Sequence, residues 1–411
     1  MIVFFLIYLS LRLRLIYNLL NNSFFSIGFF NLFSFLVPLN IVFITKISSF
    51  GFTSWRAEKF VNSELNLVLM YVLVNDVILH LLSHFRLKNQ TIKNITIKPV
   101  INSKRMFFIL SSLALLIWFY LTFGISRDQY VDVNNGDGFL ININFILLSL
   151  LYIDSLQRKG TERIIFSGLI FSIGVLYAVA GYRMILIILI LIFFSEYFKD
   201  SKAKIRSHLK YIPLVAFVYL LLIIIAETRK MGNVFDLDIY TIFSRSNILL
   251  IVSEYQSAHE QILFYSLYEA FESGHFNYGG YYLDSIIRVL PKEFYSLFDS
   301  PLRINDVIKA KFAPPEFSSN NLNLGAYYLT ESFLNFGAIG LITVNIFSFY
   351  FFYWIEKIKY YSNRNYYLYL FIVSLIPSFV YYGLNAFLKP LVYFWIIYLI
   401  IVLLRKNKSF T

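Results

Sequence analysis

Apolar stretches of membrane-spanning length follow one another along most of the chain, and one long polar segment interrupts them. A bilayer core requires about 20 consecutive apolar residues per helix. By that measure the sequence predicts eleven spans, within a range of ten to twelve. These spans are Met1–Leu20, Ile27–Ile44, Leu65–Ser83, Met106–Ile125, Phe139–Leu156, Ile164–Ala180, Met184–Phe198, Tyr211–Ala226, Gly337–Ile355, Tyr366–Leu384 and Ala386–Leu404. Arg12 and Arg14 interrupt the first, which predicts either an interfacial helix or a poor span.

The polar segment 227–336 contains half-apolar helical patterns rather than a linker composition. In the stretch 281–290, Tyr282, Ile286 and Leu290 share one helical face, and Pro291 ends that helix. Amphipathic helices of this kind suit a cap that lies on the membrane surface over a cavity. We therefore expect three parts, which are a membrane domain 1–226, a large loop 227–336 and a membrane domain 337–411 with a short tail.

Composition supports an all-α polytopic membrane protein. Hydrophobic residues make up 58% of the chain and charged residues 15%, whereas a soluble domain carries about 25% charged residues. The chain has no cysteine, which excludes disulfides, thiolate metal sites and a cysteine nucleophile.

The distribution of charge predicts the orientation of the spans. Residues 227–335 hold 8 Lys and Arg against 13 Asp and Glu, a net charge of −5, and the rest of the chain carries +17. The positive excess lies in five short loops that fall on one face if the spans alternate, and that face is then cytoplasmic. These loops begin at Arg86, Arg158, Lys199, Lys357 and Arg405. The C-terminus is then cytoplasmic and segment 227–336 external, and nucleic-acid binding is excluded because the large polar segment is acidic.

Charged residues at membrane depth are costly, so each is a functional hypothesis. Arg183, beside Gly181, and Lys389, near the external end of the last span, are candidates for gripping a diphosphate; snorkelling to headgroups explains either one equally well. Arg245 and Arg288 in the polar segment are further candidates, although Asp284 lies one helical turn before Arg288 and predicts a plain ion pair.

Two other groups have both a functional and a structural interpretation. Asp76, His80 and His84 lie on one helical stripe, where a helix–helix hydrogen-bond network is favoured over a metal site or proton relay. In the polar segment, Glu254 and His259 are candidate general bases, as is His275, and each is alternatively a solvated side chain.

Three short motifs resemble the O-antigen and capsular repeat-unit polymerases (Wzy-type). They are GYR at 181–183, YGGYYLDSIIRVLP at 278–291 and LGAYYLTESFLNFG at 324–337. The overall plan, many spans with one large loop before the last three, also resembles that of this family. The paired Arg-x10-Gly motifs of some members do not occur here, so their arginines cannot be transferred.

The resemblance implies a metal-independent glycosyltransferase of GT-C-like architecture in the bacterial inner membrane, with no cofactor. It would transfer a growing glycan from undecaprenyl diphosphate to a new lipid-linked repeat unit in O-antigen or capsule biosynthesis, with membrane lipids and a chain-length regulator protein as partners. The positive charge that stabilises the departing diphosphate would come from Arg183, Arg245 and Lys389. Glu331, Glu254 or His259 would take the hydroxyl proton, and Glu331 is alternatively a cap of the ninth span.

Three other functions remain open on the sequence. One of them, a non-catalytic membrane scaffold, is disfavoured by the external arginines and the charges at membrane depth. An O-antigen ligase shares the architecture and would favour an essential histidine in the loop. A polysaccharide flippase or other transporter fits less well, since such proteins show repeat symmetry between halves, and no internal repeat is found.

Overall fold

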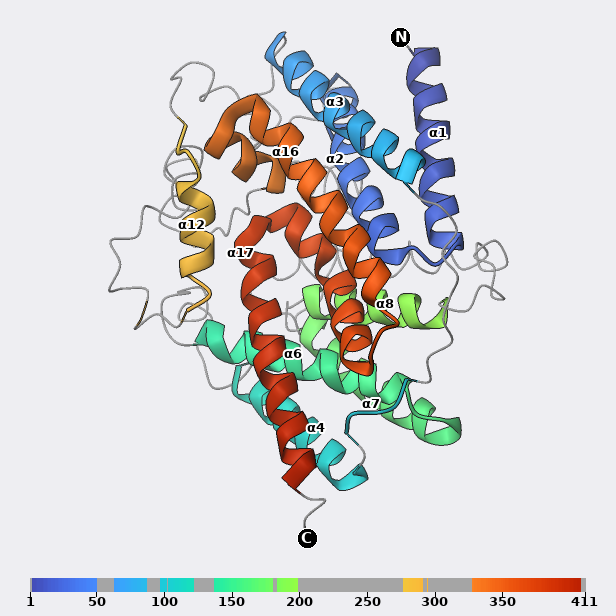
Figure 1. The fold of residues 1–411 in the computed structure, drawn as a ribbon, viewed down its shortest axis with the longest axis vertical. Helices are drawn as coiled ribbons and strands as arrows, with labels where there is room; N and C mark the ends of the chain where they lie inside the picture. Colours follow the sequence, from blue (N-terminus) through green and yellow to red (C-terminus); the bar gives the residue numbers. More distant parts are fainter. Residues whose placement is uncertain are drawn as a thin grey trace, which may run out of the picture. The chain divides into compact units, whose positions relative to one another are not determined.

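The structure is a computed structural model, and it describes residues 2–49, 63–86, 97–101, 103–121, 137–179, 183–198, 276–290, 294 and 327–407. Within these ranges every regular element is a helix (Figure 1), which confirms the all-helical class. The helices are α1 (Ile2–Asn21), α2 (Phe25–Ser49), α3 (Ser63–Arg86), α4 (Lys104–Phe119), α6 (Asp137–Leu156), α7 (Gly160–Val179), α8 (Arg183–Tyr197), α12 (Gly280–Ile287), α16 (Tyr328–Ile358) and α17 (Asn363–Asn407).

The predicted spans correspond to helices wherever the structure describes them. Helices α1 to α8 lie on the first seven predicted spans, and the eighth, 211–226, is outside the described residues. Three stretches of described helix are long and apolar enough to cross a membrane, and they are Gly160–Ala178, Tyr328–Ile358 and Asn363–Leu403. The membrane character of the chain therefore rests on helix length and composition, and the total of eleven spans remains a prediction.

The last two predicted spans form one helical run, α17, that folds back on itself at a glycine. Gly383 has φ 78° and ψ −167°, a conformation open almost only to glycine. On either side of it, the rings of Phe371 and Phe394 stack at 4.0 Å and those of Tyr367 and Tyr398 lie 5.9 Å apart. The earlier residue before the glycine pairs with the later residue after it, so the two halves run antiparallel. At 1.5 Å per residue each half is roughly 30–36 Å long, which matches a bilayer core.

Helix α16 contains a second fold-back of the same kind, at Gly337. This glycine has φ 63° and ψ −148°, and the segment before it forms the hook at the start of α16 in Figure 1. The Ser332 hydroxyl donates to the Gly340 carbonyl at 2.5 Å, and the Tyr328 hydroxyl donates to Asn345 Oδ1 at 2.8 Å. Residues 328–336 thus lie antiparallel to the start of the long half of α16, which coincides with the predicted ninth span.

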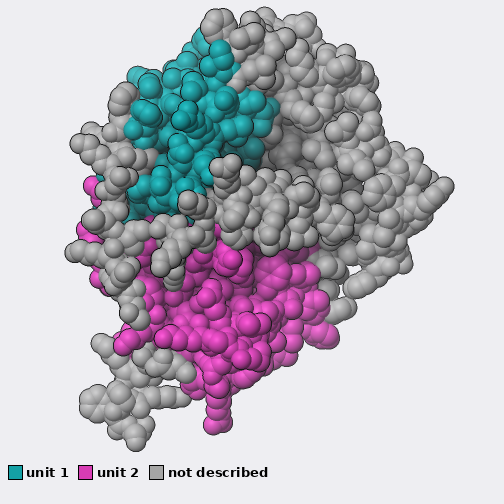
Figure 2. Space-filling model, turned by 90° about the vertical axis from the view of Figure 1, so that its right-hand side faces the viewer, with its two compact units in different colours: residues 1–90, 238–356, 376–388 teal, residues 91–237, 357–375, 389–411 magenta. Residues whose placement is uncertain are grey.

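The described chain divides into two compact units, coloured separately in Figure 2. Unit 1 comprises residues 1–90, 238–356 and 376–388, and it includes α1 to α3, α12, almost all of α16 and the tip of the α17 hairpin. Unit 2 comprises residues 91–237, 357–375 and 389–411, with α4, α6, α7, α8 and both ends of α17. Each unit combines segments that are far apart in the sequence.

A buried ion pair joins the first and third helices of unit 1. Arg12 is 0% exposed, and its Nη2 lies 2.6 Å from Asp76 Oδ1 while its Nε donates to Oδ2 at 2.7 Å. Arg12 Nη1 also donates to Asn31 Oδ1 of α2 at 2.6 Å. The helix–helix hydrogen-bond network expected at Asp76 is present, and its partner is the arginine that interrupts the first apolar stretch. Burial of Arg12 against α2 and α3 explains how α1 accommodates that charge.

The fold-back at Gly337 gives a direct test of the fold. Any other residue in this backbone conformation costs about 1–3 kcal/mol. An added Cβ would also lie 3.0 Å from the Phe276 ring. We expect Gly337→Ala to lower the free energy of unfolding by about 2–3 kcal/mol. The measurement is denaturant-induced unfolding of the purified protein in detergent micelles.

The matched control for Gly337→Ala is Gly168→Ala in α7. Gly168 lies within a regular helix, and an added Cβ there would have no atom within 4 Å. Alanine is the better helix former by about 1 kcal/mol, so this variant is expected to be neutral or stabilised. Equal destabilisation by both substitutions would contradict the special role of Gly337.

Candidate functional site

Glu331 occupies the short arm of α16, immediately before the fold-back. It is 2% exposed, and its carboxylate contacts two other elements of unit 1. The Ser285 hydroxyl of α12 donates to Oε1 at 2.9 Å, and the Leu384 backbone N–H donates to Oε2 at 2.7 Å. No ion-pair partner for Glu331 exists among the residues that the structure describes. Hydrogen bonds alone therefore hold this buried carboxylate in place.

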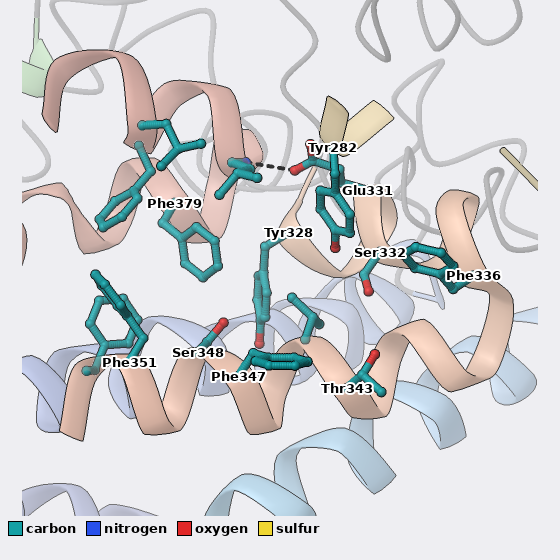
Figure 3. A pocket seen from close by; sticks show the side chains of 15 residues that line it. Tyr282, Tyr328, Glu331, Ser332, Phe336, Thr343, Phe347, Ser348, Phe351 and Phe379 are labelled. Carbon is teal, nitrogen blue, oxygen red and sulfur yellow. Dashed lines mark hydrogen bonds between the residues drawn. The ribbon is translucent and has the colours of Figure 1, made fainter. Parts of the chain in front are cut away.

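The break at Gly383 explains why the backbone of α17 needs the Glu331 carboxylate. A helix that restarts after a break has backbone N–H groups without partners in its first turn. Leu384 is the first residue after Gly383, and the side chain of Glu331 accepts its N–H (dashed in Figure 3). A carboxylate at this position also interacts favourably with the positive end of the helix dipole. The structure therefore supports a capping role for Glu331, although the helix that it caps is the second half of α17 and not the predicted ninth span.

Asn335 lies one helical turn after Glu331 and performs the corresponding task for α12. Its Oδ1 accepts the Tyr281 backbone N–H at 3.1 Å, and its Nδ2 donates to the Glu331 carbonyl at 2.8 Å. The N-cap residue of α12, Gly279, supplies no side-chain hydrogen bond of its own. Two side chains of the short α16 arm, spaced four residues apart, thus satisfy backbone groups at the start of two other helices.

A cavity of about 530 Å³ lies beside this arm within unit 1 (Figure 3). Glu331, Tyr282 and Ser332 line one end of it, and Tyr328, Thr343 and Ser348 add polar groups elsewhere in a wall that is otherwise apolar. The apolar lining residues are Phe336, Val344, Phe347, Phe351, Phe352, Phe379, Leu384, Phe387 and Leu388. Phe347 is 75% exposed, so the cavity reaches the surface of the unit. The site combines one carboxyl-bearing end with a long aromatic wall.

The phenol of Tyr282 is a neutral group at this polar end. Burial, and after it the nearby Glu331 carboxylate, raise the pKa of Tyr282 above its ordinary value, whereas a hydrogen bond with Ser332 lowers it. Because the net shift is upward, the phenol keeps its proton throughout the physiological range and remains able to donate a hydrogen bond. Tyr282 is thus a candidate for binding an oxygen of a ligand.

The structure does not bring the sequence-predicted site residues together at one place. Glu331 lines the cavity, and Arg288 pairs with Asp284 at 2.6 Å, the ion pair that the spacing predicts. Lys389 belongs to unit 2, where its Nζ lies 6.0 Å from the centroid of the Tyr393 ring. Arg183 begins α8, and its side chain is outside the described part of the structure, as are the residues Arg245, Glu254, His259 and His275.

The sequence assigns no functional role to four residues that shape this site. Asn335 stands in the motif at 324–337 and Tyr282 and Ser285 in the motif at 278–291, but none of the three is charged, and the pattern places Tyr282 only on an apolar helical face. Gly383 lies inside the tenth predicted span, near its end, where the apolar pattern gives no sign of a reversal. A useful signal would have been the Glu-x-x-x-Asn spacing before a glycine, since it places two hydrogen-bonding side chains on one helical face.

Comparisons of the chain with protein-family models, with curated proteins and with solved structures found no match.

The capping role of Asn335 predicts a loss of stability on truncation. Asn335→Ala leaves the partly buried Tyr281 N–H without its acceptor, and an unpaired buried polar group costs about 1–3 kcal/mol. We expect the free energy of unfolding to fall by about that amount, measured in detergent by denaturant titration. Thr343→Ala is the control, because Thr343 lines the same cavity but its hydroxyl bonds only to its own helix. An equal effect of the two variants would refute the capping role.

Proposed function

We propose that this chain is a polymerase of lipid-linked oligosaccharide repeat units in surface polysaccharide biosynthesis, as its resemblance to the Wzy-type family implies. It acts as a metal-independent glycosyltransferase with about eleven spans in a GT-C-like arrangement. It resides in the bacterial inner membrane with segment 227–336 on the external face. The observation that carries this proposal is the cavity beside Glu331, which combines a single buried carboxyl group with an aromatic wall.

The cavity has the properties that a lipid-linked sugar substrate requires. Its volume of about 530 Å³ falls within the range of roughly 300–1,000 Å³ that is usual for small-molecule sites. The wall presents Phe347, Phe351 and Phe379 to apolar chains, and the exposed Phe347 at its rim supplies a lateral entrance from the bilayer. The polar end lies against α12, which belongs to the segment predicted to face outward. A polyprenyl chain in the membrane and a sugar at its surface would both be accommodated.

In the proposed reaction, a hydroxyl oxygen of the acceptor repeat unit attacks the anomeric carbon of the donor glycan. The bond from that carbon to the diphosphate oxygen breaks, and undecaprenyl diphosphate leaves with the electron pair. The hydroxyl proton passes to the Glu331 carboxylate. Two of the roughly four lone-pair positions of this carboxylate accept hydrogen bonds from Ser285 and Leu384. Acceptor capacity therefore remains for the substrate hydroxyl.

Positive charge must stabilise the departing diphosphate. The candidates are Arg183, Arg245, Arg288 and Lys389. Arg288 is the C-cap residue of α12, three residues after Ser285, and its pairing with Asp284 fixes its side chain beside this helix. Glu254 and His259 are the alternative bases.

Substitution of Glu331 by glutamine separates the chemical role from the capping role. The glutamine carbonyl can still accept the Leu384 N–H, and the side-chain amide can donate to the Ser285 hydroxyl, but neither group accepts a proton at neutral pH. We expect polymerisation of lipid-linked repeat units by purified protein to fall about 100-fold or more, the usual contribution of a general base. Thermal stability in detergent should stay near that of the unmodified protein.

The control for Glu331→Gln is Ser285→Ala. This substitution removes one hydrogen bond of the carboxylate and keeps the base, so polymerisation should fall by less than about tenfold. Full activity of Glu331→Gln would exclude Glu331 as the base and would leave Glu254 or His259 for that role. In that case the corresponding glutamine and alanine variants are measured next.

Deletion of the gene in the source bacterium tests the function as a whole. We expect surface glycan that carries a single repeat unit, because repeat units are still made and exported but are not joined. The measurement is electrophoresis of extracted surface glycan. Normal long-chain polymer in the deletion strain would refute the proposal, and complete absence of glycan on the acceptor would indicate a ligase. Loss of ligation on substitution of His259 or His275 would support that second outcome.

A further inference from the structure

The beginnings of α4 and α7 lie side by side in unit 2. Lys104 Nζ, in the first turn of α4, is 2.5 Å from Glu162 Oε1, in the first turn of α7. One turn further on, the rings of Phe107 and Phe166 stack at 4.4 Å. Two helices of 16 and 20 residues therefore begin at the same end of the unit.

Buried interactions fix this junction in place. The Asp154 carboxylate near the end of α6 accepts the Ile101 N–H at 2.8 Å and contacts Arg158 Nη2 at 3.2 Å. The Arg158 guanidinium lies over the Phe107 and Phe166 rings, at 5.2 Å and 4.7 Å from their centroids. Because Asp154 compensates Arg158, this pair adds no net charge. These buried contacts hold the junction together, and its net positive charge comes from the other basic residues at its surface.

The first turns of both helices carry basic residues where acidic ones are favoured. A helix N-terminus has a partial positive charge, so cations near it are unfavourable and anions favourable. Lys104 and Arg105 begin α4, which has no acidic residue in its first turn. Lys159 and Arg163 flank the start of α7, and Glu162 is the one acidic residue in that turn. Arg105 and Lys159 are exposed and form no hydrogen bond or ion pair with another described residue. The junction therefore has positive charge that the described protein does not compensate.

Exposed apolar side chains continue directly from these charges along both helices. On α4, Phe108 is 48% and Ile109 58% exposed, and on α7, Ile164 is 73% and Ile165 56% exposed. A ligand that covers the whole surface must combine an anionic group with hydrocarbon chains. A phospholipid has both, whereas a nucleic acid or a free phosphate ion lacks the chains.

We propose that the junction of α4 and α7 is a binding site for an anionic phospholipid. Arg105, Lys159 and Arg163 bind the phosphate, with the backbone N–H groups at the two helix starts contributing. The acyl chains lie along Phe108, Ile109 and Ile164. In the predicted topology this site faces the cytoplasmic leaflet, where anionic lipid attracts basic residues. The site is independent of glycan transfer, so it stands or falls separately from the proposed function.

The test is lipid titration of the full-length protein in detergent, monitored by native mass spectrometry. The probes are phosphatidylglycerol, cardiolipin and phosphatidylcholine, with inorganic phosphate as a chain-free anion. We expect the two anionic lipids to bind and phosphatidylcholine to bind at least tenfold more weakly. Arg105→Gln combined with Arg163→Gln should weaken phosphatidylglycerol binding about 30-fold, because each basic residue near an anionic headgroup contributes about 1 kcal/mol.

Two matched variants separate a specific site from general attraction to positive charge. Lys357→Gln combined with Arg364→Gln removes the same charge from another part of unit 2 and should leave the affinity within about threefold. Arg105→Lys combined with Arg163→Lys keeps the charge and should retain most of the binding, even if the glutamine variant does not fold. Equal binding of phosphatidylcholine, an equal loss in the control pair, or saturation by inorganic phosphate that displaces the lipid would each overturn the proposal.

Discussion

The arrangement of unit 1 around its cavity depends on one hydrogen-bonded carboxylate, that of Glu331. Helices that fold back within a membrane leave backbone N–H groups without partners, and no water is present in the hydrocarbon region to satisfy them. Glu331 accepts such an N–H from Leu384 after the break at Gly383, and it accepts the hydroxyl of Ser285 on α12. With Asn335 one turn away, the short arm of α16 holds the tip of one helical hairpin and the start of another helix. The cavity lies among these elements, so its shape follows from the same contacts.

This capping role and the proposed catalytic role place different demands on Glu331. Capping requires a carboxylate in a fixed position, whereas a general base requires a free acceptor site directed at the substrate. Both demands are met if the two structural hydrogen bonds hold the side chain and its remaining lone pairs face the cavity. Glu331→Gln preserves the first property and removes the second, while Ser285→Ala does the opposite in part. The two variants therefore discriminate between a residue that only supports the site and one that takes part in the reaction.

The two units handle buried charge by the same physical rule. In unit 1, Arg12 is fully buried against Asp76 and Asn31, and in unit 2, Arg158 is buried against Asp154 with aromatic rings beside its guanidinium. Such pairs are costly to form in an apolar interior and costly to break by removal of one partner. They therefore fix how neighbouring helices pack within each unit. Basic residues without such partners, as at the beginnings of α4 and α7, instead remain available to a ligand.

The sequence by itself determined the helical class and the position of most helices. Apolar stretches of about 20 residues must form helices in a bilayer, because only a helix satisfies its backbone within one segment. The sequence also predicted the Asp284–Arg288 pair and a network at Asp76, since residues four apart on a helix are neighbours and a membrane charge requires a partner. Tertiary structure alone decided that Arg12 is that partner, that α17 reverses at Gly383, and that Glu331 caps Leu384. These contacts join residues from 23 to 64 positions apart, and periodicity within one helix carries no information about which distant helix will lie beside it.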